Sequence, residues 1–329
     1  MSSPTRRVIN LILDWDGTLT HKDTLHLVAK IGYDKQGLPM SGPIDYPLPM
    51  LSWETISSKY MDEYKRHKMR YKPMAADRSC LSDERAWLAS LKPIEVYGAR
   101  TAESAQIFRG VEKSDIRTAA QVAVDSGDLV LRRGWNVLAS HALAAGSLSI
   151  LSVNWSATFI RCALLASLRT TKDTIDDALC KYVETDLRID ANDIQECDRV
   201  GGSLGELRQR NEADDVRTSA DKLLRLPERC QSLLEDRNAS SSVDEALVVY
   251  CGDSDTDLEC LLAADVGVCF RDGEMTGAQK SLAITLERLR VQVKPIEDFS
   301  INSLSETCLW TAHDFHQILN ALKILEVPA

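Results

Sequence analysis

The chain has 329 residues, enough for one large domain or two modest ones. Apolar residues make up 44 % and charged residues 27 %, which is ordinary for a globular protein and excludes a disordered class. The formal net charge of −10 argues against nonspecific binding to nucleic acid or to an anionic membrane, so we expect neither as a partner. An acidic pocket can still take a phosphorylated ligand when a bound cation reverses the local charge.

The cysteines and the apolar stretches bear on the compartment. The nine cysteines are scattered, without a CxxC pair or zinc spacing, and an odd number favours free thiols in a reducing compartment. The apolar run before Asp14 is too short for the core of a signal peptide. Residues 157–168 are apolar but contain Arg161 and cannot span a bilayer. These features predict a cytoplasmic protein.

Four short apolar runs predict the strands of a parallel sheet. They cover residues 8–13, 148–153, 246–250 and 266–270, and three of them end at acidic residues or at glycine next to an acidic residue. Helical patterns lie between them, at 134–145, 157–168, 219–236 and 257–264. Strands that alternate with helices predict an α/β fold with a doubly wound (Rossmann-like) parallel sheet.

Residues 20–130 have little strand signal and several helical patterns, so we expect a helical cap inserted after the first strand. Apolar and aromatic residues recur at helical spacing from Trp53 to Tyr64. Residues 82–85 are expected to cap a second helix, and 115–124 to form a third. The predicted organisation is a catalytic core of residues 1–19 and 131–329 and a cap of residues 20–130. The aromatic stripe is expected mainly to pack the cap.

Two clusters of aspartates follow predicted strands. Asp14 and Asp16 follow the first strand, and the aspartates at 253, 255 and 257 follow the third. In open α/β sheets ligands bind at the carboxyl ends of the strands, so we expect both clusters at one edge. Such a group of carboxylates needs a cation, and oxygen ligands suit Mg²⁺. Each aspartate alone is more often a turn or cap residue, but two clusters at two strand ends favour a site.

Other kinds of site are disfavoured by specific positions. A calcium loop starting at Asp253 would need glycine and glutamate where Leu258 and Ala264 stand. The chain contains neither a Walker phosphate loop nor a GxSxG nucleophile motif.

Four segments resemble the motifs of haloacid dehalogenase-type phosphatases. Residues 14–20, DWDGTLT, resemble the first motif, DxDGT[LV], and residues 252–257, GDSDTD, resemble the fourth, GDxxxD. The strand ending in Ser152 resembles the second motif, and Lys222 near a helix start resembles the third. The inserted helices are similar to the cap of the phosphoserine-phosphatase branch. The whole chain looks most like fungal cold-tolerance-type hydrolases, while its long cap and the region around 170–218 depart from compact phosphoserine phosphatases.

This resemblance implies a Mg²⁺-dependent phosphatase that acts on a small phosphorylated metabolite through an aspartyl-phosphate. Asp14 would be the nucleophile and Asp16 the general acid and base. The implied metal ligands are Asp14, the backbone carbonyl of Asp16, Asp253 and Asp257. The implied phosphate and substrate contacts are Ser152, Asn154 and Lys222.

Several alternatives stay open from the sequence. Lys172 rivals Lys222 as the motif-three lysine, and Asp255 is expected only to orient its loop. A phosphomutase uses the same paired aspartates, and an inactive binding protein on this fold is a third possibility. Asp16 argues against the dehalogenase and P-type ATPase branches, whose chemistry does not use an aspartate at this position.

Overall fold

The structure is a computed structural model that describes residues 8–42, 45–170, 177–207, 215–227 and 247–325. Its sheet has seven strands in the order β3-β2-β1-β4-β5-β7-β6, and every neighbouring pair is parallel. The strands are β1 Ile9–Leu13, β2 Gly146–Leu151, β3 Arg188–Asp190, β4 Leu247–Gly252, β5 Val266–Phe270, β6 Gln292–Pro295 and β7 Cys308–Ala312. The predicted parallel α/β sheet is confirmed.

The pleat of β1 divides the core between the two faces of the sheet. Ile9, Leu11 and Leu13 are buried in one apolar cluster, and Ile12 is buried in the other. The first cluster includes residues of α6 Trp135–Ala145, α7 Ala157–Thr170, α8 Asp177–Thr185 and α13 Phe315–Leu325. The second includes residues of α9 Ser219–Leu223, α11 Leu258–Ala263 and α12 Gly277–Arg288. Helices therefore cover both faces, as a doubly wound sheet requires.

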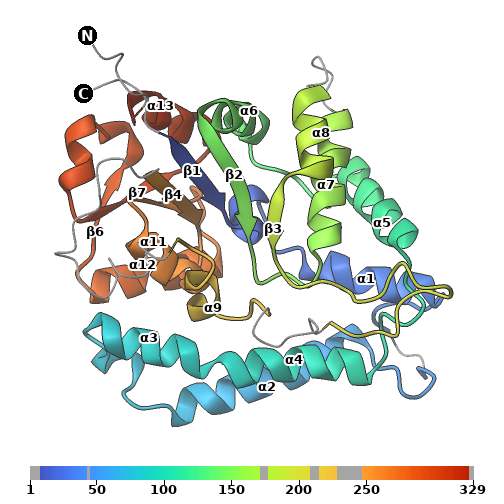
Figure 1. The fold of residues 1–329 in the computed structure, drawn as a ribbon. Coiled ribbons are helices and arrows are strands. Elements are labelled where there is room, and N and C mark those ends of the chain that lie inside the picture. Colours follow the sequence, from blue (N-terminus) through green and yellow to red (C-terminus); the bar gives the residue numbers. More distant parts are fainter. Residues whose placement is uncertain (1–7, 43–44, 171–176, 208–214, 228–246, 326–329) are drawn as a thin grey trace.

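In the described part of the chain, five α-helices lie between β1 and α6, the helix that directly precedes β2. They are α1 Leu25–Lys35, α2 Trp53–Arg70, α3 Leu81–Ser90, α4 Lys92–Ser104 and α5 Lys113–Ser126. Figure 1 shows α2, α3 and α4 as a layer across the carboxyl ends of the strands, whereas α5 runs beside α7 and α1 packs against α5. An antiparallel bridge joins Thr20 to Leu131, so the segment leaves and re-enters the core at one place. The cap boundary at 20–130 stays a prediction.

Several predicted elements differ from the observed ones. Helix α3 begins at Leu81 with Cys80 at its N-cap and without a side-chain cap, so the predicted cap at residues 82–85 is wrong. The helix predicted at 219–236 ends at Leu223, and residues 228–236 lie outside the described part. Three strands, β3, β6 and β7, were not predicted. Charged or polar residues interrupt β3 and β6, as expected for edge strands with one unpaired side.

The remaining short elements are a π-helical turn at Trp15–Leu19 and 3₁₀ turns at Ala75–Asp77, Asp255–Asp257, Ile296–Asp298 and Ile301–Ser305. Within the described ranges, the helices are all too short or too polar to cross a membrane.

Candidate active site

The first aspartate motif turns sharply at the carboxyl end of β1. Leu13 pairs with Cys251 of β4, and the N–H of Asp14 donates to the Cys251 carbonyl at 2.9 Å. This register brings Asp14 beside the end of β4. Gly17 has a φ of +75°, and a Cβ there would lie 2.2 Å from Oδ2 of Asp253. Only glycine therefore allows the turn to approach the second aspartate motif, residues 252–257, so closely.

Asp14, Asp253 and Asp257 form a buried carboxylate cluster. Each offers an oxygen that lies within 4.8 Å of the others. Burial, reinforced by neighbouring carboxylates, raises the pKa of Asp14 to about 8 and that of Asp253 to about 9. Three carboxylates face a single contacting ammonium group, Lys222, within the described residues, so the protein's own cations do not fully balance their negative charge. The cluster thus has the hard oxygen donors and the unbalanced charge that a divalent cation fits.

Lys222 is the one ammonium group that contacts this cluster among the described residues. It is fully buried, and its Nζ lies 2.7 Å from Oδ1 of Asp14 and 2.7 Å from Oδ1 of Asp257. Burial lowers its pKa, but the two carboxylates outweigh burial and the net shift is upward, so it stays charged. A capping box of Thr218 and Asp221 starts α9 and sets the position of the lysine. Lys172, the rival position, lies outside the described residues.

Both carboxylate oxygens of Asp257 already accept hydrogen bonds from the protein. Oδ1 accepts from the hydroxyl of Tyr250 at 2.6 Å as well as from Lys222. Oδ2 accepts from the backbone N–H groups of Asp253 and Ser254, each at 3.1 Å. Asp257 therefore fixes the loop and the lysine, while Asp253 is the freer carboxylate. Asp255 contacts Ser281 of α12 instead.

Asp16 is held by donors on both of its carboxylate oxygens. Oδ1 accepts from the N–H and the hydroxyl of Thr24, both at 2.7 Å, and Oδ2 accepts from Nδ2 of Asn154 at 2.8 Å. Burial, with help from the charge of Asp23, raises the pKa of Asp16 to about 7, and the bonds from Asn154 and Thr24 oppose that rise. A carboxyl group with this pKa can both give and accept a proton near neutral pH.

Ser152 and Asn154 follow β2 at the same edge of the sheet. Ser152 is fully buried, and its Oγ accepts from the N–H of Asn154 at 3.1 Å, which leaves the hydroxyl hydrogen available. The amide of Asn154 donates to Asp16 and to Thr24, and its oxygen accepts from the N–H of Ser156 at 3.1 Å. Every polar atom of this amide thus has a partner within the protein, and the predicted substrate contact of Asn154 stays a prediction.

Sequence reasoning missed residues that support the site. Arg132 is buried, pairs with both oxygens of Asp272 at 2.5 and 2.8 Å, and donates to the Gly17 carbonyl at 2.7 Å. It follows the insertion in sequence and belongs to no motif, so only its spatial position reveals it. Tyr250 lies inside a predicted strand, where an aromatic residue is expected only to pack in the apolar core.

Two curated fungal proteins are similar to this chain over most of its length, although no protein-family model matches it. A CTO1 family protein of Schizosaccharomyces pombe is 25 % identical over 317 residues, which cover 94 % of this chain and 98 % of the relative. Cold tolerance protein 1 of Saccharomyces cerevisiae is 22 % identical over 312 residues, covering 89 % and 88 %. The predicted resemblance to fungal cold-tolerance-type proteins is confirmed.

Solved structures also resemble this chain. A substrate-bound phosphoserine phosphatase complex matches 97 % of this chain and 99 % of its own, with 11 % identity and a TM-score of 0.44. Cytosolic 5'-nucleotidase IIIB bound to cytidine matches 97 % of this chain and 85 % of its own, with 10 % identity and a TM-score of 0.46.

Proposed function

We propose that this chain is a magnesium-dependent phosphatase that hydrolyses a small phosphomonoester through an aspartyl-phosphate on Asp14. One observation carries the proposal: Asp14 is buried between the Lys222 ammonium and a carboxylate cluster at the carboxyl ends of β1 and β4. Asp16, the predicted acid and base, lies two residues further along the same turn. This combination supports phosphoryl transfer rather than simple ligand binding, because a nucleophile and a proton donor both face one end of the sheet.

The residues present fit a magnesium ion. The carboxylate of Asp253 and the second oxygen of Asp14 accept the fewest hydrogen bonds in the cluster. We assign these oxygens as metal ligands together with the backbone carbonyl of Asp16. Asp257 would act mainly by holding Lys222 and the loop, since both of its oxygens accept several hydrogen bonds. Bound Mg²⁺ would supply positive charge that offsets the carboxylates and the phosphate of the substrate.

The chain's own residues account for the bond changes. A carboxylate oxygen of Asp14 attacks phosphorus as the ester P–O bond breaks, and Asp16 gives a proton to the leaving oxygen. A water molecule then attacks phosphorus while Asp16 takes its proton, and the bond to Asp14 breaks. The products are the free alcohol, inorganic phosphate and the Asp14 carboxylate. Ser152 and Lys222 would stabilise the phosphoryl oxygens by donating hydrogen bonds.

We further propose that residues 20–130 choose the substrate and that the protein works in the cytoplasm. The layer of α2, α3 and α4 lies over the strand ends where the nucleophile stands, so its side chains are placed to contact a leaving group (Figure 1). The eight described cysteines are all free, which suits a reducing compartment. The substrate class that follows is a small phosphorylated metabolite.

The test is phosphate release from a panel of phosphorylated metabolites, measured with Mg²⁺ and with excess chelator. We expect release that needs Mg²⁺ and that Asp14→Asn abolishes while the fold survives. Asp34→Asn, an exposed aspartate on α1, is the matched control and should keep full activity. Release that persists in Asp14→Asn would contradict the assignment. Phosphate transfer to a second sugar phosphate, without net release, would favour a phosphomutase.

A further inference from the structure

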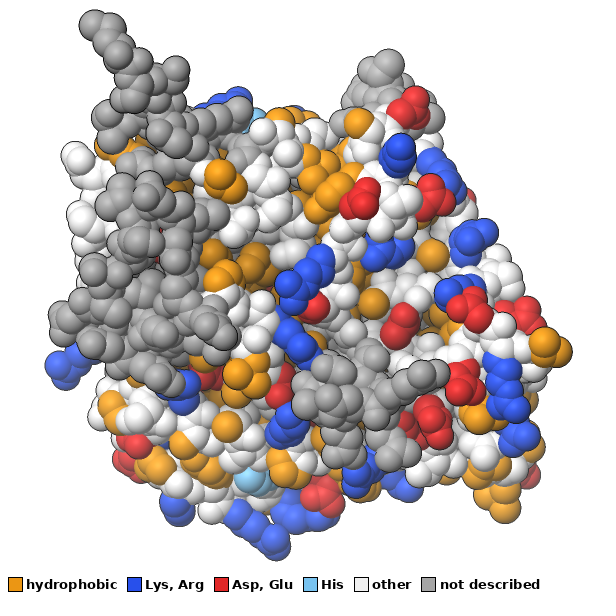
Figure 2. Space-filling model, viewed as in Figure 1, with side chains coloured by type: hydrophobic (Ala, Val, Ile, Leu, Met, Phe, Trp, Pro, Cys, Tyr) orange, Lys and Arg blue, Asp and Glu red, His pale blue; other side chains and the backbone are white. Residues whose placement is uncertain are grey.

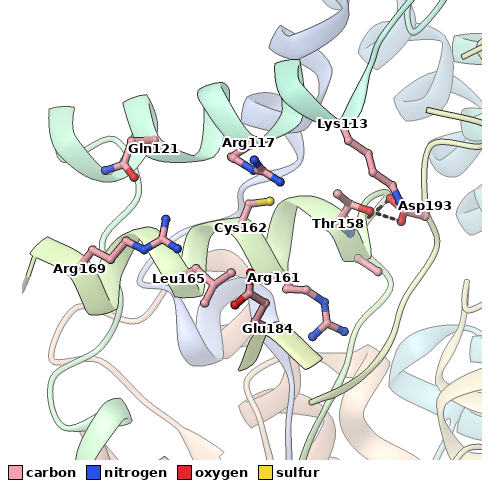
Figure 3. A pocket seen from close by; sticks show the side chains of 11 residues that line it. Lys113, Arg117, Gln121, Thr158, Arg161, Cys162, Leu165, Arg169, Glu184 and Asp193 are labelled. Carbon is pink, nitrogen blue, oxygen red and sulfur yellow. Dashed lines mark hydrogen bonds between the residues drawn. The ribbon is translucent and has the colours of Figure 1, made fainter. Parts of the chain in front are cut away.

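Two basic stripes face each other on α5 and α7. Lys113, Arg117 and Gln121 follow one another at intervals of four residues on α5, and Arg161, Leu165 and Arg169 do so on α7. Residues four apart share one face of a helix. All six line one pocket of about 490 Å³, which Ala157, Thr158, Cys162, Glu184 and Asp193 complete. Figure 3 shows Arg117 reaching from α5 toward Cys162 on α7.

Within the described ranges of the chain, the guanidinium groups of this pocket lack carboxylate partners. Arg161 donates to the backbone carbonyls of Val183 and Leu187, and Arg117 interacts with the Cys162 thiol. Neither they nor Arg169 form an ion pair with a carboxylate of the described residues. Lys113 alone is paired, with Asp198 at 2.6 Å, and that aspartate does not line the pocket.

The two carboxylates in the lining do not change this balance. Asp193 accepts hydrogen bonds from the hydroxyls of Ser156 and Thr158, at 2.8 and 2.5 Å, and so holds the start of α7. Glu184 is exposed on α8. The pocket therefore has four cationic and two anionic side chains in a chain whose net charge is −10. Facing stripes of like charge weaken the packing of two helices, and a bound anion would relieve that repulsion.

We propose that this pocket binds a small phosphorylated molecule at a second site, separate from the catalytic carboxylates. Arginine groups bind phosphate through paired hydrogen bonds, and the volume lies in the range of small-molecule pockets. Figure 2 shows basic and acidic side chains interspersed over the face that carries α5, α7 and α8, so a small ligand fits better than a nucleic acid.

A chain of hydrogen bonds connects this pocket with the catalytic site. Asp193 accepts from the hydroxyl of Ser156, whose N–H donates to Asn154, whose amide in turn donates to Asp16. None of the residues that line the pocket belongs to the carboxylate cluster. The ligand would therefore lie next to the hydrogen-bonded residues that connect the pocket with Asp16, Ser156 and Asn154, without occupying the position of the substrate.

Cys162 provides a local test on the full-length protein that needs no catalytic activity. Its alkylation by iodoacetamide is followed by peptide mass spectrometry, in chelator, with and without pyrophosphate as the probe. At a probe concentration ten times its Kd, we expect alkylation of Cys162 to slow by about tenfold. The exposed Cys80, at the start of α3, should keep its rate and serves as the internal control.

The variant Arg117→Gln/Arg169→Gln should lose this protection, when the rates with and without probe are compared within each protein. Arg66→Gln, an exposed arginine on α2, should keep it, and thermal unfolding checks that both variants fold. Three results would overturn the proposal: no protection, equal protection by sodium chloride at the same ionic strength, or full protection in the double variant. The catalytic assignment would stand in each case, because the readout does not involve turnover.

Discussion

At the scale of single residues, the hydrogen bond from Asn154 helps to lower the pKa of Asp16. The Asn154 amide donates to Oδ2 of Asp16 and opposes the rise in pKa that burial causes. Asn154→Ala should therefore move the limb of the pH–rate profile that belongs to Asp16 to higher pH, with a loss in kcat of up to about 10²–10⁴-fold. Asn10→Ala, near the opposite end of β1, is the control and should leave the profile unchanged. A fall in kcat with an unmoved limb would show that Asn154 serves the fold alone.

A second residue-scale prediction concerns two glycines with positive φ. Gly17 has φ +75°, and a Cβ added there would lie 2.2 Å from Asp253. Gly37 has φ +67°, and a Cβ added there would have no heavy atom within 4 Å. Gly37→Ala should cost only the backbone term, about 1–2 kcal/mol of unfolding free energy. Gly17→Ala should cost more and should also weaken Mg²⁺ binding, because Asp253 must move. Thermal unfolding and Mg²⁺ titration of both variants measure this, and equal metal affinities would refute the argument.

At the scale of elements, ion pairs fasten the inserted helices to helices of the core. Arg85 of α3 donates to Glu259 of α11 at 2.6 Å, and Lys92 of α4 donates to Asp221 of α9 at 2.6 Å. Glu259 is 1 % exposed and its second oxygen has no partner among the described residues, so it depends on Arg85 for its charge balance. These contacts hold the cap layer against the helices that carry Lys222 and the second aspartate motif.

Breaking one such pair should destabilise the protein more than removing both partners. Arg85→Met leaves the Glu259 carboxylate buried without its partner and should cost about 1–3 kcal/mol of unfolding free energy. Arg85→Met/Glu259→Met should recover most of that loss, because no buried charge remains. Arg66→Met, in an exposed pair with Glu63 on α2, is the matched control and should change stability by less than about 1 kcal/mol. Denaturant unfolding of the four proteins measures the differences; a double variant as unstable as Arg85→Met would contradict the explanation.

At the scale of the whole molecule, the carboxylate cluster links stability to pH and to metal. The pKa values of Asp14 and Asp253, about 8 and about 9, lie above their value of 3.8 in an unfolded chain. A carboxyl group whose pKa is raised by folding stabilises the folded protein fully at pH values below its unfolded-state pKa. This stabilisation is lost as the pH rises through its folded-state pKa. The metal-free protein should therefore lose stability from these groups between about pH 4 and pH 9.

Magnesium should reverse this loss, because it binds the deprotonated carboxylates. We expect the rise in Tm on adding Mg²⁺ to be larger at about pH 8.5 than at about pH 6. Comparing chelator with Mg²⁺ at each pH cancels the contribution of groups that do not contact the metal. A shift in Tm that is equal at both pH values, or larger at the lower one, would exclude Asp14 and Asp253 as the ligands.

The sequence was enough to predict a parallel α/β sheet, four of its seven strands, and the edge of the sheet where we propose the chemistry takes place. Apolar runs that stop at aspartates identified β1 and β4, and the parallel register then required Asp14 and Asp253 to meet at one edge. These inferences succeed because they depend on the local pattern and on a rule that holds for every parallel sheet. The edge strand β6 escaped prediction, since an exposed strand needs no continuous apolar run.

The tertiary structure alone decided which side chains contact each other. Lys222 contacts Asp14 across 208 positions of sequence, and Arg132 contacts Asp272 across 140. Asn154 supports Asp16, and basic residues of α5 and α7 line one pocket because those helices pack together. No local pattern contains such pairings, because they depend on how distant elements pack once their apolar faces are buried. The sequence therefore indicated the candidate site, and long-range packing decides which side chains meet there.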